Sequence, residues 1–167
     1  MLKHSSLAAF SLIAILSACG VAQSQGAAEA QDASFMPLNG DWRGVGTLQH
    51  QNGVTERIRC EANYRAASPD RMSQSLRCRS DQTEFALVAN LALNGREIVG
   101  DWTETKRNAR GALRGRLSPG VLQGQVEGPG FAANVQIRFA ANQQNVSIRS
   151  AGQEMNNLNM VLTRAGR

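Results

Sequence analysis

Apolar and polar residues alternate along most of the chain after Gly40. The segment 83–93, TEFALVANLAL, shows the pattern well, because every second residue from Phe85 to Leu93 is apolar. A period of two is typical of a β-strand with one buried face, whereas an amphipathic helix repeats every ~3.6 residues. No segment after Gly40 sustains the helical period. The pattern therefore predicts an all-β fold.

Short turn signals separate these segments. They are QNG at 51–53, ASPD at 67–70, SDQ at 80–82, NG at 94–95, RNARG at 107–111, SPG at 118–120, GPG at 128–130, ANQQN at 141–145 and AGQE at 151–154. Turns this short pair consecutive strands as antiparallel hairpins, and a meander of about ten strands hides its edges completely only by closing. We therefore predict a single domain, residues 39–167, folded as an up-and-down antiparallel β-barrel of about eight to ten strands.

The alternation also assigns one set of side chains to the barrel interior. The set comprises Trp42, Leu48, Ile58, Leu76, Phe85, Leu87, Leu91, Ile98, Trp102, Leu113, Leu117, Leu122, Val126, Phe131, Val135, Ile137, Phe139, Val146, Ile148, Leu158, Met160 and Leu162. Several glycines, among them Gly44 and Gly46, fall at inward places, where glycine marks a tight bend or a close approach of two backbones.

The first residues have the pattern of an export signal. Lys3 and His4 precede an apolar run from Leu7 to Ala18, which is shorter than the ~20 residues that a membrane-spanning helix needs. We therefore interpret residues 1–18 as a cleaved signal peptide. The alanine-, glutamine- and serine-rich segment that follows, residues 19–38, has little to bury and is expected to be a flexible tether.

The sequence LSAC, residues 16–19, resembles the bacterial lipobox. The resemblance implies cleavage before Cys19, lipidation of its thiol and a location on the bacterial cell envelope facing the periplasm, and Gly20 resembles the residue that sorts such proteins to the outer membrane. Two or more acyl chains hold a protein stably in a membrane. The alternative is an ordinary signal peptide with an incidental cysteine.

Cys60 and Cys78 are the two cysteines that remain, and an even pair in an exported protein predicts a disulfide. If the two residues face each other across a hairpin, the turn centres on Pro69, within an independent turn signal. The same register places Glu61 opposite Arg77 and Arg57 opposite Asp81, both favourable pairs, and Arg59 opposite Arg79, an unfavourable one.

Composition excludes several classes of function. Basic residues number 18 and acidic residues 13, but no run of like charge or cluster of aromatic residues indicates a nucleic-acid site. His50 is the only histidine after the leader, so we expect no metal site and no cofactor. The G-x-S-x-G nucleophile motif is missing, and we expect a protein without enzymatic activity.

Two segments, NGDWRGVG at 39–46 and VGDWTET at 99–105, share Gly-Asp-Trp. A G-x-W at the start of the first strand resembles the calycin superfamily of lipocalins, avidins and fatty-acid-binding proteins. The resemblance implies a barrel in which Trp42 packs across the closed end. Trp42 and Trp102 are accordingly either core residues or parts of a ligand site.

Glu104 shares an alternation face with Trp102, and an inward carboxylate must be paired or solvated. Glu104 and Arg107 are therefore candidates for binding a small polar ligand at the mouth of a pocket. The alternative is a salt bridge at the barrel rim. Glu56 falls on the Ile58 face and raises the same question.

The domain also resembles a family of small exported proteins from alphaproteobacteria that has no assigned function. The shared residues are Gly40, Trp42, Gly44, Gly46, Cys60, Cys78, Gly100, Trp102, Glu104, Arg107, Asn108, Gly111, Leu113, Gly115, Arg116, Val146 and Ile148. The resemblance implies a fold and a compartment.

Outward arginines form a further pattern. Arg57, Arg59, Arg77, Arg79, Arg114 and Arg116 are expected to form an arginine-rich wall. Arginine's planar fork suits phosphate groups, such as those of membrane lipids; the alternative is a solvated face.

Three functional hypotheses follow. The first is a non-enzymatic envelope lipoprotein whose barrel binds a small amphipathic ligand or an envelope component. The second is a protein-binding module, such as an inhibitor of a secreted protease or lysozyme, by resemblance to the metalloprotease-inhibitor barrels with their tryptophan and paired cysteines. The third is a structural envelope protein.

Overall fold

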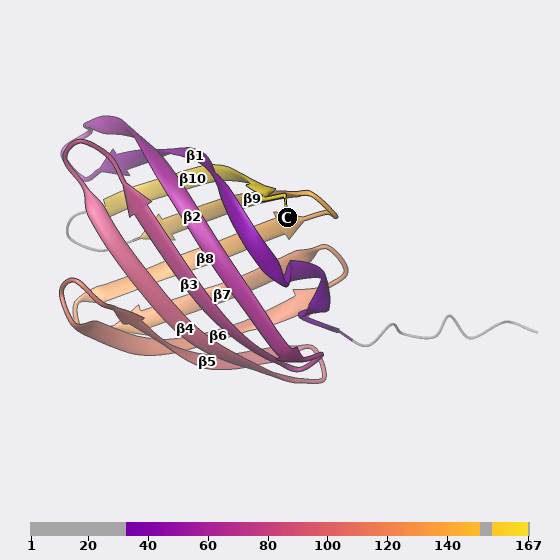
Figure 1. Ribbon diagram of the computed structural model, residues 1–167. Helices are drawn as coiled ribbons and strands as arrows, with labels where there is room; N and C mark the ends of the chain where they lie inside the picture. Colours follow the sequence, from indigo (N-terminus) through magenta and orange to yellow (C-terminus); the bar gives the residue numbers. More distant parts are fainter. Residues whose placement is uncertain (1–32, 151–154, 167) are drawn as a thin grey trace, which may run out of the picture. The chain divides into compact units, whose positions relative to one another are not determined.

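A computed structural model describes residues 33–150 and 155–166 of the protein. These residues form one short 3-10 helix and ten strands (Figure 1). The elements are η1 (Met36–Leu38), β1 (Gly40–His50), β2 (Thr55–Ser68), β3 (Arg71–Arg79), β4 (Glu84–Asn94), β5 (Glu97–Glu104), β6 (Ala109–Ser118), β7 (Val121–Gly128), β8 (Phe131–Phe139), β9 (Gln143–Ser150) and β10 (Met155–Arg164).

Each strand pairs antiparallel with the next one, and β1 also pairs with β10, so the sheet closes into a barrel. The predicted up-and-down barrel is confirmed, at the upper end of the expected strand number. The predicted turns each join two consecutive strands, except that the signal at 151–154 lies outside the described residues. The closed sheet leaves no strand edge unpaired, which removes the tendency of open edges to recruit other chains.

The predicted interior set is confirmed, since each of its residues is buried or packs against the core. The alternation missed Tyr64 and Met72, which are also buried. Both lie close to the β2–β3 turn, where the prediction placed no core residue.

The disulfide between Cys60 and Cys78 has the predicted register. The two residues are directly opposite each other, with Glu61 opposite Arg77 and Arg59 opposite Arg79. Both cysteines are buried on the inner side of the wall. The expected Arg57–Asp81 pair is wrong, because β3 ends at Arg79 and Asp81 lies in the following turn.

Glycines at inward places allow β1 and β10 to approach closely. A Cβ atom at Gly44 would overlap the carbonyl oxygen of Val161, and one at Gly46 would overlap that of Asn159. Since both clashes are with backbone, a flexible side chain cannot relieve them. The seam that closes the barrel therefore depends on these two positions.

One end of the barrel is plugged by the residues before β1. Phe35 and Leu38 are fully buried, and the Trp42 indole nitrogen donates to the Leu38 carbonyl oxygen over 2.8 Å. The prediction that the tether extends to residue 38 is therefore wrong for 35–38, because Phe35 and Leu38 belong to the core. Residues 1–18, Cys19 and the rest of the tether to residue 32 lie outside the described residues.

Arg164, the last residue of β10, fixes this plug. Its guanidinium lies 4.1 Å from the centre of the Trp42 ring and donates to the carbonyl oxygens of Pro37 (2.8 Å), Ala141 (2.9 Å) and Asn39. The expected packing of Trp42 across the closed end is confirmed, with Arg164 covering the ring.

Every strand pairing closes within Gln31–Arg167, which forms one compact unit with its own core. A unit of this kind can fold alone. In the part of the chain that the structure describes, no helix has the length and apolar character required to traverse a bilayer.

We expect reduction of the disulfide to destabilise the barrel. The bond closes a loop across a sequence separation of 18 residues, and constraining such a loop in the unfolded chain contributes about 3 kcal/mol. Urea unfolding with and without reductant measures the loss. The Cys60→Ala/Cys78→Ala variant should be as unstable as the reduced protein and insensitive to reductant; an unchanged midpoint on reduction would contradict the prediction.

Arg164→Met should lower the free energy of unfolding by about 2 kcal/mol, because the cation–π contact and three carbonyl partners are lost together. Arg149→Met is the matched control, since Arg149 is exposed on the neighbouring strand β9. Thermal unfolding of both variants checks the expectation, which fails if the two lose equal stability.

Candidate functional site

The barrel encloses a cavity of about 970 Å³. It opens at the end opposite η1, on the left in Figure 1, between the turns that join β1 to β2, β3 to β4, β5 to β6 and β7 to β8. The residues that line this mouth include Asn52, Gln82, Arg107 and Pro129. Among the described residues, Phe35, Leu38 and Trp42 are buried at the opposite end and plug it.

The wall of the cavity is mainly apolar. It is formed by inward side chains of nearly all strands, including Leu76, Phe85, Leu87, Leu91, Leu113, Leu122, Val126, Phe131, Val135, Ile137 and Ile148. The binary alternation of the strands positions these residues, and an apolar lining of this kind suits the hydrocarbon part of a ligand.

A few polar groups interrupt the apolar wall. The Tyr64 hydroxyl, on the wall, donates to Gln144 Oε1 over 3.1 Å, and burial raises the pKa of the Tyr64 phenol. Gln74, the cross-strand neighbour of Tyr64, also lines the cavity. The buried Gln144 Nε2 has no hydrogen-bond partner among the described residues. Gln144 lies 80 residues from Tyr64, so alternation alone could not bring these two side chains together.

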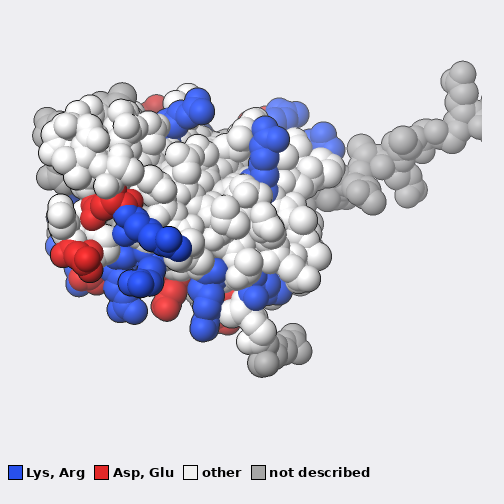
Figure 2. Space-filling view, turned by 90° about the horizontal axis from the view of Figure 1, so that it is seen from above, with Lys and Arg blue, Asp and Glu red and all other residues white. Residues whose placement is uncertain are grey.

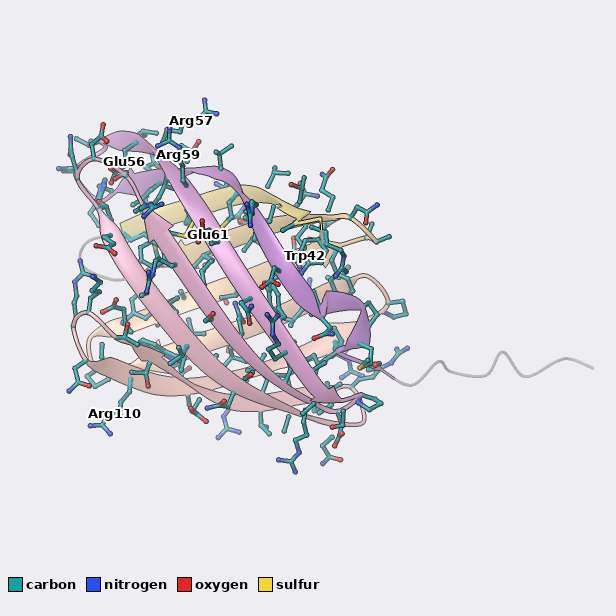
Figure 3. All side chains as sticks on the ribbon, viewed as in Figure 1. Trp42, Glu56, Arg57, Arg59, Glu61 and Arg110 are labelled. Atoms are coloured by element: carbon teal, nitrogen blue, oxygen red, sulfur yellow. A yellow bond between two sulfur atoms is a disulfide. The ribbon has the colours of Figure 1, made fainter. Side chains whose placement is uncertain are left out.

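Trp102 forms part of the wall nearer the mouth. Its indole nitrogen donates to the Glu127 carbonyl oxygen over 3.2 Å, and its ring meets Phe131 edge to face, with 5.7 Å between ring centres. Its polar atom is therefore engaged, and Trp102 presents an apolar surface to the cavity. Trp42 does not line the cavity and lies toward the plugged end (Figure 3). Of the two alternatives for Trp42, the structure supports the core residue and not the ligand contact.

Glu104 lies at the mouth and lines the cavity. Its carboxylate accepts hydrogen bonds from the backbone N–H groups of Ala86 (3.0 Å) and Arg107 (2.5 Å). Burial raises the pKa of Glu104, but the N–H donors of Ala86, Arg107 and Lys106, and the charge of Arg107, outweigh it, so the pKa is lowered. The side chain is ionised at neutral pH and holds the β5–β6 turn against β4.

Arg107 is exposed in the same turn and also lines the mouth. The structure thus brings together the two polar candidates that the sequence singled out, Glu104 and Arg107. Glu104 is mainly engaged by backbone donors, so the simple rim salt bridge describes it incompletely.

Glu56, labelled at the upper left of Figure 3, contacts His50 and Thr83, which line the cavity near its mouth. It accepts hydrogen bonds from Ser80 Oγ and from Thr83 Oγ1 (2.5 Å), and it lies 2.5 Å from His50 Nε2. Burial alone would raise the pKa of Glu56. The hydrogen bonds from Ser80, Thr83 and His50 lower the pKa by more than burial raises it, so the net shift is downward. Sequence reasoning placed Glu56 inward but missed this cluster, whose partners lie at the end of β1 and in the β3–β4 turn.

The predicted six-arginine wall is wrong as a single surface. Arg114 and Arg116 lie on β6, which β4 and β5 separate from β3. Arg116 also pairs with Glu97 over 2.7 Å. The remaining arginines, on β2 and β3, form a separate group on the outer face.

No protein-family model matches the chain, and no curated protein matches it either. Solved structures do. The crystal structure of Rv2717c from M. tuberculosis has a TM-score of 0.64 and 12% identity over 78% of this chain and 94% of that chain. The S-type phycobiliprotein lyase CPES from Guillardia theta has a TM-score of 0.56 and 12% identity over 80% and 90%. The likeness is one of fold, a β-barrel.

Glu104→Gln should lower stability at neutral pH by about 1–3 kcal/mol, because the amide nitrogen would face a backbone donor. The wild-type protein gains stability from this carboxylate above its unfolded pKa near 4.5 and loses it as the pH falls through the lower folded pKa. Unfolding free energies measured from pH 7 to pH 3 should therefore converge for the two proteins. A constant difference over that range would contradict the assignment.

Proposed function

We propose that this protein is a non-enzymatic, lipid-anchored protein of the bacterial cell envelope that binds a small amphipathic molecule inside its barrel. The observation that carries the binding proposal is the cavity of about 970 Å³ with a mainly apolar wall. The anchor, the outer-membrane location and the kinship with exported alphaproteobacterial proteins rest on the sequence patterns around Cys19 and in the domain.

The cavity has the size and lining of a small-molecule site. Ligand pockets commonly measure roughly 300–1,000 Å³ and combine apolar walls with a few polar groups. Each Å² of apolar ligand surface that enters contributes on the order of 25 cal/mol. The apolar part of the ligand accordingly lies among Leu87, Val126 and Val135, in the interior.

The polar part of the ligand lies at the mouth. Glu104 is ionised there, and Arg107 and His50 line the same opening. Charges of both signs at one rim favour a zwitterionic or uncharged polar head group over a strongly anionic one. A tail-first orientation follows, since the described residues at the opposite end, Phe35, Leu38 and Trp42, are packed into the plug.

The inhibitor alternative relies on an extended N-terminal strand. Residues 35–38 are folded into the plug, with Phe35 and Leu38 buried, and are not available for that role. The third hypothesis, a structural envelope protein, predicts no ligand, so a binding measurement distinguishes it from our proposal.

An uncharged fluorescent single-chain amphiphile should bind the purified domain, residues 31–167, at micromolar concentration. Val135→Trp, which places an indole inside the cavity, should weaken this binding at least ~10-fold, since the cavity volume is shared with the probe. Fluorescence titration gives the dissociation constants.

Val99→Trp is the matched control, because Val99 is exposed on the outer wall of β5. It should bind the probe like the wild type. Equal loss in both variants, or no binding by a folded wild-type domain, would refute the cavity as the site. Native mass spectrometry of the protein from its own host should then show a retained molecule that Val135→Trp lacks.

A further inference from the structure

Five arginines converge on the outer face of β1, β2 and β3. Arg43 lies on β1, Arg57 and Arg59 on β2, and Arg77 and Arg79 on β3. All five are exposed, and Figure 3 shows Arg57 and Arg59 directed away from the barrel. We name these five residues the arginine face.

The register of the sheet fixes their spacing. Glu61 lies between Arg43 and Arg77 in one row across the three strands, and Arg59 lies directly opposite Arg79. Opposed residues of an antiparallel pair have Cβ atoms about 4.5–5.5 Å apart, and like charges at that distance destabilise the sheet. The fold therefore holds positive charge together against its own repulsion.

Glu61, opposite Arg43 and Arg77, is one negative charge among these five positive ones. Among the described residues, none of the five guanidinium groups lies within 4.0 Å of a carboxylate. Elsewhere on the outer wall, Arg65 pairs with Asp41 over 3.1 Å and Arg116 with Glu97. In Figure 2, basic side chains cover more of the visible surface than acidic ones.

A groove of about 260 Å³ lies on the arginine face. Arg43, Arg59, Arg77 and Arg79 line it together with Glu61. A planar guanidinium donates two parallel hydrogen bonds to a phosphate, and converging guanidinium groups recognise such anions better than a dispersed positive charge does. The groove is thus shaped and charged for a phosphate ester.

An apolar strip continues the arginine face toward β10. Val45 is paired in register with Arg59 on one side and with Val161 on the other, and both valines are exposed, at 40% and 46%. Arginines beside exposed aliphatic side chains match the two components of a lipid interface, phosphate and hydrocarbon.

We propose that the arginine face binds the phosphate groups of anionic membrane lipids. This assignment of a lipid source rests on the proposed function, in which Cys19 is anchored. The 15 residues from Cys19 to Ala33 span at most roughly 50 Å when extended, which lets the barrel rest on the membrane that holds its anchor. Anchor and arginine face then act as two joined membrane contacts, each raising the effective concentration of the other.

The test uses residues 31–167, the compact unit without the anchor. Vesicles of phosphatidylcholine with phosphatidylglycerol should bind this domain, and pure phosphatidylcholine vesicles should not. Each arginine near an anionic membrane changes binding by about fivefold, so Arg59→Gln/Arg79→Gln should bind about 25-fold more weakly. Vesicle sedimentation at low salt measures this partitioning.

Arg110→Gln/Arg149→Gln is the control with the same loss of net charge. Both residues are exposed on other strands, and Figure 3 shows Arg110 away from Arg57 and Arg59. The control should keep most of the binding. An equal loss in both double variants would overturn the proposal, because it would reveal attraction by net charge alone.

Soluble glycerol phosphate separates the two sources of phosphate. Competition by glycerol phosphate with intact vesicle binding supports the lipid assignment, whereas binding of glycerol phosphate without any vesicle binding overturns it. Thermal unfolding confirms that each variant is folded. Val135→Trp, which alters the cavity and not the arginine face, should bind vesicles like the wild type. A failure of the cavity proposal would therefore not change the vesicle result.

Discussion

The pairing of β1 with β10 is the constraint on which the rest of the structure depends. This pairing closes the meander into a barrel, gives the backbone groups at the edges of β1 and β10 hydrogen-bond partners, and creates an interior. Gly44 and Gly46 permit the close approach of the two strands at this seam. Arg164, at the end of β10, then joins the last strand to the ring of Trp42 on the first. Loss of the seam would remove both the cavity and its plug.

Closure gives the two ends of the barrel different properties. Apolar residues and carbonyl oxygens fill the end beneath η1, where Phe35, Leu38 and Trp42 are buried. Ionised carboxylates hold the turns at the other end, with Glu56 bonded to Ser80 and Thr83. The barrel therefore has three distinct regions: a plugged end, a polar mouth and a charged outer surface. The proposed ligand site uses the mouth and interior, and the proposed lipid contact uses the outer surface.

Local signals were enough to predict most of the fold. Alternation and turn residues are short-range properties, so they predicted the barrel and its inward set, and the Pro69 turn predicted the Cys60–Cys78 register. The plug was missed because the apolar run at 35–38 is only four residues long and does not alternate, and only the closed barrel gives Phe35 and Leu38 a place to pack. The resemblance of the first strand to calycins nevertheless predicted the position of Trp42.

The candidate site was harder to predict than the fold. Alternation tells which side chains point inward but not how much space they leave, so the cavity had no sequence signal. Tyr64 and Gln144 are 80 residues apart, and their hydrogen bond depends on the curvature of the whole sheet. The same curvature separates Arg114 from the arginines of β2 and β3, although all of them alternate outward.

The most direct test of the central claim is the position of a bound amphiphile in solution. A spin-labelled uncharged amphiphile added to methyl-labelled protein broadens the NMR signals of methyl groups near the label. The account predicts broadening of Leu87, Val126 and Val135, which line the cavity, and sharp signals from Val88 and Val99 on the outer wall. Broadening of the outer valines with unchanged interior signals would contradict it.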